Sequence, residues 1–286
     1  MSKFGFGLKV CYVYRMKFGL KDGHSIYYED SENKHANYSL IFLNGLSQST
    51  LSWSAIAPSF KNSRVILVDL LFQGKSDAPQ NFRSYNDHAE DVAALIQHLR
   101  LKNTIVCGIS YGSAVAQHLL VHHSNLLSGG ILMSTFGHNT PLFNAIGESW
   151  KSALIAGGYP LMLDVMLPVV LGKSYFENPF IPIETLKESR VARDLKPENL
   201  LKLMQATETR GDFRSHLKHI NKPVLVVHGA EDLLIPVATA KEVADNIPGA
   251  EFRVISDAGH TLNLEAIPQV IQLIKEFLEK NTERKK

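Results

Sequence analysis

The residue best suited to act as a nucleophile is Ser110, in the segment Gly108-Ile109-Ser110-Tyr111-Gly112. Apolar residues at 105–107 predict a short buried strand before it, and residues 114–121 predict a helix after it. A G-x-S-x-G sequence between a strand and a helix is typical of a sharp turn that lifts the serine hydroxyl clear of a sheet. We therefore predict that Ser110 is a nucleophile, the alternative being a serine that only caps a helix.

A serine hydroxyl is a weak nucleophile and needs a base, usually a histidine that a carboxylate orients. His260 follows a predicted strand at 251–255, and Asp232 follows another at 223–228. The order serine, acid, histidine is the one expected for this strand-turn-helix arrangement. Loops that follow parallel strands meet at one edge of a sheet. We therefore predict a triad of Ser110, Asp232 and His260.

Other polar residues compete for these roles. Glu231 and Asp257 are alternatives to Asp232, which we prefer because its turn directly precedes a Leu-Ile-Pro segment. His118 and His122 have the i, i+4 spacing of a metal pair, but no third ligand is suggested. We therefore predict neither a metal ion nor a cofactor.

The tetrahedral intermediate of acyl transfer carries an oxyanion, which needs backbone donors already aimed at it. The residue after the nucleophile, Tyr111, should supply one N–H group. Leu46 should supply the other, since it follows the dipeptide Asn44-Gly45 at the end of a predicted strand. The alternative interpretation of Asn44-Gly45 is an ordinary turn.

Composition narrows the class of protein. The 286 residues, 45% of them hydrophobic, suit one large α/β domain or one domain with an insertion. A net charge of +2 predicts no strong attraction to nucleic acid or acidic membranes. The two cysteines, Cys11 and Cys107, do not form a disulfide framework, and we see no secretory signal. We expect a cytoplasmic protein whose partner is a small molecule, and the oligomeric state is left open.

Strands alternate with helices along most of the chain. Unbroken apolar strands of the kind seen here are buried on both faces, as in parallel sheets. We therefore predict a mostly parallel central sheet flanked by helices. Trp53, Ile56 and Phe60 mark one of the expected helices. Further strands are expected at 16–20, 25–29, 38–43, 64–69 and 130–133, and further helices at 86–101, 239–247 and 268–280.

The alternation breaks between residues 137 and 219, where helical patterns dominate and no clear strand is visible. We interpret this segment as a helical cap inserted into an α/β core of residues 1–136 and 220–286. Large apolar residues of the cap could line an acyl pocket or form the cap's own core, and they favour an acyl or aromatic substrate. These residues are Leu142, Phe143, Trp150, Leu154, Met162, Met166 and Phe176.

The most apolar stretch of the cap spans residues 156–172. Pro160, Asp164 and Pro168 interrupt it. A membrane-spanning helix needs about 20 consecutive apolar residues. We therefore predict no membrane span.

With these motifs in place, the chain from Met16 to Leu278 resembles the serine hydrolases of the α/β-hydrolase superfamily. The resemblance implies a Ser-His-Asp triad and an acyl-enzyme, and it implies a structural role for Asp69. The motifs that carry it are Asn44-Gly45-Leu46, the loop at 69–77, the segment around Ser110, the turn Gly229-Ala230-Glu231-Asp232 and the loop Asp257-Ala258-Gly259-His260.

Within that superfamily the chain is similar to small carboxylesterases, to 3-oxoadipate enol-lactonases and to the acyltransferase that makes the hydroxyacyl dimer of rhamnolipids. Asn44 stands where histidine is more frequent, which weakens a match to epoxide hydrolases, and Ser110 disfavours haloalkane dehalogenases. We expect hydrolysis of a carboxylic ester, lactone or thioester. The alternatives are transfer of a (hydroxy)acyl group to a hydroxyl acceptor, and a ligand-binding protein without enzymatic activity.

Overall fold

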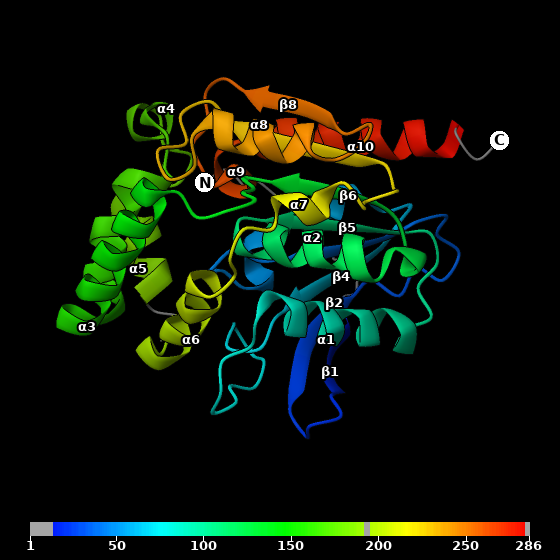
Figure 1. The fold of residues 1–286 in the computed structure, drawn as a ribbon, viewed down its shortest axis with the longest axis horizontal. Helices are drawn as coiled ribbons and strands as arrows, with labels where there is room; N and C mark the ends of the chain where they lie inside the picture. Colours follow the sequence, from blue (N-terminus) through cyan, green and yellow to red (C-terminus); the bar gives the residue numbers. More distant parts are fainter. Residues whose placement is uncertain (1–13, 192–194, 284–286) are drawn as a thin grey trace, which may run out of the picture.

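The fold is built on one eight-stranded sheet, which extends from β8 at the top to β1 at the bottom of Figure 1. The computed structural model describes residues 14–191 and 195–283. The strand order is β1-β2-β4-β3-β5-β6-β7-β8, in which β3 to β8 are parallel and β2 pairs antiparallel with both β1 and β4. The prediction of a mostly parallel sheet is therefore confirmed. The strands are β1 Tyr14–Gly19, β2 Ser25–Asp30, β3 Ser39–Leu43, β4 Arg64–Asp69, β5 Thr104–Ile109, β6 Leu127–Met133, β7 Val224–Gly229 and β8 Glu251–Ile255.

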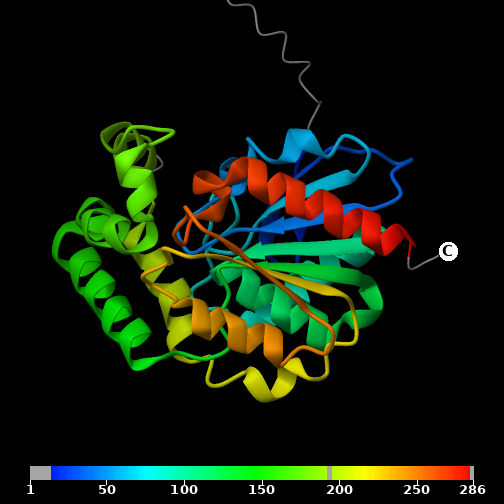
Figure 2. The ribbon, with the colours of Figure 1, turned by 90° about the horizontal axis from the view of Figure 1, so that it is seen from above.

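Helices cover both faces of the sheet (Figure 2). Side chains from α1, α2 and α8 join the hydrophobic core on one face, and side chains from α9 and α10 join the core on the other. Four of these helices agree with the predicted ones, and the one-turn helix α9 was not predicted. They span α1 Tyr85–His98, α2 Tyr111–His122, α8 Val237–Asp245, α9 Leu262–Glu265 and α10 Ile267–Glu283.

The apolar strands have no solvent-facing side because successive residues feed opposite cores. On β3, Leu40 and Phe42 pack into the core under α10, whereas Ile41 and Leu43 pack into the core under α1 and α2. All four side chains are fully buried. The run of apolar residues that suggested a parallel strand therefore reflects burial on both faces.

One predicted helix is wrong. The segment that carries Trp53, Ile56 and Phe60 forms two short 3₁₀ turns, Thr50–Trp53 and Ala57–Ser59, in place of one α-helix. Pro58 lies in the second turn and has no N–H group to continue an α-helix through this segment. The three apolar side chains are nevertheless buried, which explains their helix-like spacing.

A separate group of helices lies beside the carboxyl ends of the parallel strands (Figure 1). It corresponds to the predicted helical cap, and we call it the cap layer. The boundaries of the cap remain our interpretation. Its helices are α3 Pro141–Val170, α4 Lys173–Glu177, α5 Ile183–Val191 and α6 Pro197–Glu208, and α7 Arg214–Leu217 leads back to the sheet.

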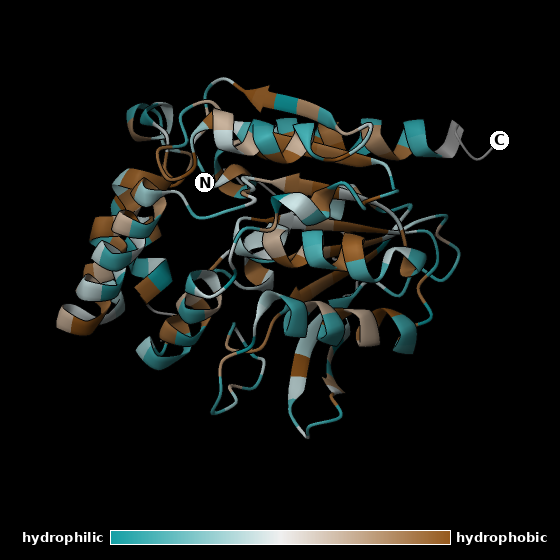
Figure 3. Ribbon diagram, viewed as in Figure 1, coloured by the Kyte–Doolittle hydropathy of each residue, from teal (hydrophilic) through white to brown (hydrophobic). Residues whose placement is uncertain are grey.

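Helix α3 is long and apolar enough to cross a membrane by length and composition alone, and Figure 3 shows hydrophobic residues along it. Such a helix is weak evidence for a span. Non-helical backbone at Gly157 and Gly158 breaks it into two parts, each shorter than the roughly 20 residues a span needs. The absence of a membrane span stays a prediction.

A buried histidine of α1 makes the stability of the fold depend on pH. His88 is fully buried beside Phe72 and Tyr111, and neither ring nitrogen has a hydrogen-bond partner. Burial lowers its pKa from 6.5 to about 3. The folded protein therefore holds this ring neutral, while the unfolded chain binds a proton below pH 6.5. The stabilisation is complete above pH 6.5 and is lost as the pH falls toward 3.

We expect the free energy of unfolding of His88→Leu to fall less between pH 7.5 and pH 5.5 than that of the natural protein. The two decreases in the free energy of unfolding should differ by about 1.4 kcal/mol. Below pH 6.5, each pH unit changes this free energy by that amount for one proton that only the unfolded chain binds. Urea unfolding at both pH values measures it. Replacing the exposed His219 by leucine is the control and should leave the pH dependence unchanged. Equal slopes for His88→Leu and the natural protein would contradict the burial of a neutral ring.

Candidate active site

The turn between β5 and α2 holds Ser110 in an unusual backbone conformation, with φ 52° and ψ −113°. Residues other than glycine rarely adopt a positive φ, because this backbone conformation is strained. Such strain persists only where the surrounding structure imposes it. Here the two flanking glycines impose it. A Cβ atom on Gly108 would lie 2.3 Å from the carbonyl oxygen of Gly112, and one on Gly112 would lie 2.4 Å from that of Leu43. The turn therefore packs against both β5 and β3 more closely than any other residue type allows.

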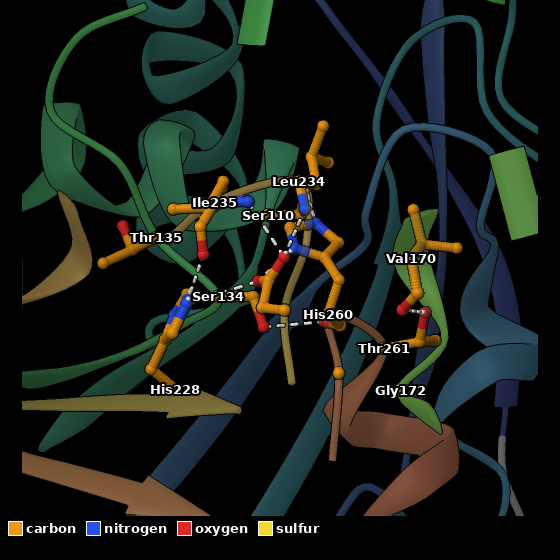
Figure 4. Close-up of polar contacts among 12 residues, drawn as sticks. Ser110, Ser134, Thr135, Val170, Gly172, His228, Leu234, Ile235, His260 and Thr261 are labelled. Carbon is orange, nitrogen blue, oxygen red and sulfur yellow. Dashed lines mark hydrogen bonds and ion pairs between the residues drawn. The ribbon is translucent and has the colours of Figure 1, made fainter. Parts of the chain in front are cut away.

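The three residues predicted from sequence lie in one chain of hydrogen bonds (Figure 4). His260 Nε2 is 2.8 Å from Ser110 Oγ, and His260 Nδ1 is 2.7 Å from Asp232 Oδ2. Because a carboxylate only accepts, Nδ1 carries the proton of the neutral ring and Nε2 presents its lone pair to the serine hydroxyl. This is the arrangement in which an imidazole can take a proton from an attacking alcohol.

The acid is held by its own loop. Asp232 Oδ1 accepts hydrogen bonds of 2.9 Å from the backbone N–H groups of Leu234 and Ile235. The side chain is buried, so these donors replace the water that a carboxylate would otherwise bind. The competing carboxylates point elsewhere: Glu231 accepts from Ser174 in the cap layer, and Asp257 is exposed beside Ser256.

A second buried histidine supports the same carboxylate, and sequence reasoning missed it. His228 Nε2 lies 2.8 Å from the Ile235 carbonyl oxygen and 3.3 Å from Asp232 Oδ2 (Figure 4). Since both neighbours are acceptors, Nε2 carries the proton. Burial lowers the pKa of His228, so the ring is held neutral. The sequence signal was the i, i+4 spacing of His228 and Asp232 across the end of one strand.

The loop that carries the base is fastened to the cap layer. The backbone N–H of His260 donates to Val170 O, and its carbonyl oxygen accepts from Ser134 Oγ at 2.7 Å. The half-buried carboxylate of Glu265 accepts from three backbone N–H groups, those of Gly172, Gly259 and Thr261, each at 2.8 Å. Nothing local in the sequence marks Glu265 for this function, because the residues it joins are up to 93 positions away.

The two N–H groups predicted for the oxyanion border the same pocket. The backbone N–H groups of Leu46 and Tyr111 have no acceptor within residues 14–191 and 195–283. The neighbouring N–H of Gly45 donates to Gln48 Oε1, and Gln48 in turn pairs with Asn263 on α9. This network fixes the loop after β3.

Asn44 and Asp69 are structural at this edge of the sheet. The Asn44 side chain donates to Val68 O and to Asp69 Oδ1, and it accepts from Trp53 Nε1. Asp69 also accepts from the backbone N–H groups of Thr50 and Lys75. Neither side chain lines the pocket beside Ser110.

A pocket of about 740 Å³ opens beside Ser110. Phe143 and Trp150, two of the apolar cap residues singled out from sequence, line it. Four of the others do not: Leu154 and Met162 are core residues, while Leu142 and Phe176 are exposed. Met166 lines a smaller, adjoining cavity of about 40 Å³. The pocket is therefore walled by both the sheet and the cap layer.

No group of three or more metal-binding side chains is found in the described part of the chain. His118 is buried and stacks on the Phe213 ring with centroids 4.0 Å apart, and burial lowers its pKa to about 3. Its ring lies 5.8 Å from that of His122. His118 thus serves in packing.

Comparisons with known proteins agree with this fold. A model of the family described as "Alpha/beta hydrolase family" matches residues 40–273. The chain is 24% identical over 260 residues to 2-hydroxymuconate semialdehyde hydrolase of Pseudomonas sp. (strain CF600), covering 85% of this chain and 87% of that protein. It is 26% identical over 231 residues to 3-oxoadipate enol-lactonase 2 of Acinetobacter baylyi, covering 79% and 83%.

Among solved structures, a thermophilic esterase of Thermogutta terrifontis, determined with malate bound, superposes with a TM-score of 0.83 at 25% identity. The match covers 94% of this chain and 99% of that one.

We expect Gly112→Ala to destabilise the protein by about 1–3 kcal/mol, because the new Cβ would overlap backbone atoms of Leu43 and Asn44 that cannot move aside. Urea unfolding measures the change. Gly19→Ala is the matched control, since a Cβ there meets nothing within 4 Å. A Gly112→Ala protein as stable as the control would show that the turn is less tightly packed than described.

We expect His228→Leu to cost about 1–3 kcal/mol of stability, because it leaves the buried Ile235 carbonyl oxygen without its donor. His228→Gln keeps a side-chain N–H and should recover part of the loss. Thermal and urea unfolding of both variants provide the measurement. Equal losses for the two substitutions would mean that packing, and not the hydrogen bond, holds this histidine.

Proposed function

The chain belongs to the α/β hydrolase family, and we propose that it is a serine hydrolase that cleaves a carboxylic ester, lactone or thioester through an acyl-enzyme. The observation that carries the proposal is the chain of hydrogen bonds from Asp232 through His260 to Ser110. The relatives named as an enol-lactonase and as an esterase support hydrolysis of an ester bond.

In the proposed reaction, Ser110 Oγ attacks the acyl carbon while His260 Nε2 takes its proton. Asp232 stabilises the imidazolium that forms, and its bond to Nδ1 keeps the ring in the required tautomer. His260 then gives the proton to the leaving group. Water, activated by the same histidine, releases the acid and restores the serine.

The negative charge on the tetrahedral intermediate would be held by the backbone N–H groups of Leu46 and Tyr111. Their lack of acceptors and their place beside Ser110 support this assignment. Donors fixed in a partly dry site stabilise a developing charge without having to reorganise during the reaction. Gln48 contributes indirectly, since it holds Gly45 and so positions the Leu46 N–H.

The size of the pocket supports a substrate of moderate size. A volume of about 740 Å³ is within the range of pockets for small molecules. Phe136, Phe143, Trp150 and Met204 make much of its wall apolar, which suits an acyl or aromatic group.

We expect Ser110→Ala to lose at least about 10³-fold of kcat on p-nitrophenyl esters and to lose labelling by a fluorophosphonate probe. Ser54→Ala, at an exposed serine, is the control and should keep both. Equal esterase activity in the Ser110→Ala and natural proteins would overturn the proposal.

Product analysis separates the alternatives. Free acid as the only product indicates hydrolysis, whereas acyl groups on an added alcohol indicate acyl transfer. An unreactive Ser110 in the natural protein would favour a ligand-binding protein on this fold.

A further inference from the structure

A cation without a partner lies close to the proposed nucleophile. Arg190, near the carboxyl end of α5, is only 7% exposed. Its guanidinium has no hydrogen-bond acceptor and no carboxylate partner within the described residues. The nearby Tyr175 hydroxyl is already engaged with the backbone of Ile181, both as donor and as acceptor.

Burying a charge without a partner is costly, so buried arginines in proteins are almost always paired. Two other arginines with little exposure follow that rule. Arg64 forms a three-bond contact with Asp30, and the buried Arg210 donates to Phe136 O and to Gln117 Oε1. Among the described residues Arg190 is therefore an exception, and we look for its acceptor in a bound molecule.

The position of Arg190 indicates where that acceptor would be. Arg190 lines the small cavity of about 40 Å³ together with Ser110 and His260. This volume holds a group of only a few atoms, on the order of one or two water molecules. The small cavity and the 740 Å³ pocket share four residues: Leu46, Ser110, Trp150 and Leu234. A molecule whose reactive carbon lies at Ser110 can thus extend a short arm to Arg190 and a long arm into the larger pocket.

The charges lining the two spaces differ. Among described residues, no lysine or arginine lines the larger pocket, which instead has the carboxylates of Glu148, Glu208 and Asp212 along its wall. Arg190 is the cation of the small cavity, and no carboxylate lines that cavity. Those three carboxylates are paired with Lys151 and Arg214, so within the described chain the larger pocket offers an anion no free cation. An anionic group on a substrate would therefore be attracted to Arg190 in the small cavity.

We propose that Arg190 binds a carboxylate on the short arm of the substrate. The substrate class is then an ester, lactone or thioester whose short acyl side ends in a free carboxylate and whose other side is apolar. A guanidinium binds a carboxylate through two parallel N–H···O bonds, which also fixes the orientation of the scissile carbonyl. This inference rests on the proposed function for the position of the reacting carbon, but the binding it predicts does not require turnover.

The test measures binding without turnover. Calorimetry on the Ser110→Ala protein compares monohexyl succinate with hexyl 4-oxopentanoate, in which a methyl ketone replaces the carboxylate. We expect about tenfold tighter binding of monohexyl succinate, the usual effect of a hydrogen bond to a charged group. Adding Arg190→Met should abolish the preference, and adding Arg190→Lys should keep part of it. Lys187→Met, on the same helix and at a partly exposed side chain, should leave it unchanged.

Equal binding of the two probes would overturn the inference, even if Arg190→Met failed to fold. So would a preference that persists in Arg190→Met. The fate of the proposed function is read separately, from fluorophosphonate labelling and hydrolysis of neutral esters by the natural protein. If these occur without a preference for the carboxylate, only the assignment of Arg190 fails. If they do not occur while the preference is found, only the reaction fails.

Discussion

The rest of the site depends on the hydrogen bonds that the buried carboxylate of Asp232 accepts. This carboxylate is buried, and it is stabilised by two backbone N–H groups of its own loop on Oδ1 and by two histidines beside Oδ2. One of these, His260, is the proposed base, and the other, His228, ties the loop to β7. Moving the carboxylate would therefore disturb the loop, the tautomer of His260 and the approach to Ser110 together.

Those parts of the site that follow directly from strand ends could be predicted from sequence. Ser110, Asp232 and His260 each come after an apolar strand, and parallel strands bring their carboxyl ends to one edge. The helix expected around Trp53 was wrong because the spacing of buried residues is similar in an α-helix and in successive 3₁₀ turns. There the local effect of Pro58 outweighs the pattern.

Other parts of the site could not be predicted because their roles depend on contacts with residues far away in the sequence. Glu265 looks like an ordinary acidic residue of a short helix, yet its carboxylate binds the backbone at Gly172. Arg190 looks like a surface arginine of a polar helix, and it is buried only once α5 packs against α3 in the cap layer. Local patterns give periodicity and turns, whereas the lack of an acceptor for a charge becomes visible only after folding.

The attachment of the cap layer to the loops of the acid and the base has a mechanical consequence. Val170 O accepts from the His260 N–H, and the Gly172 N–H donates to Glu265, whose carboxylate also holds Gly259 and Thr261. The Ser174 N–H donates to Glu231, the neighbour of Asp232. Hydrogen bonds thus connect the segment between α3 and α4 to the loops that carry the reacting groups. Insertions or deletions in this segment would therefore displace the reacting groups themselves.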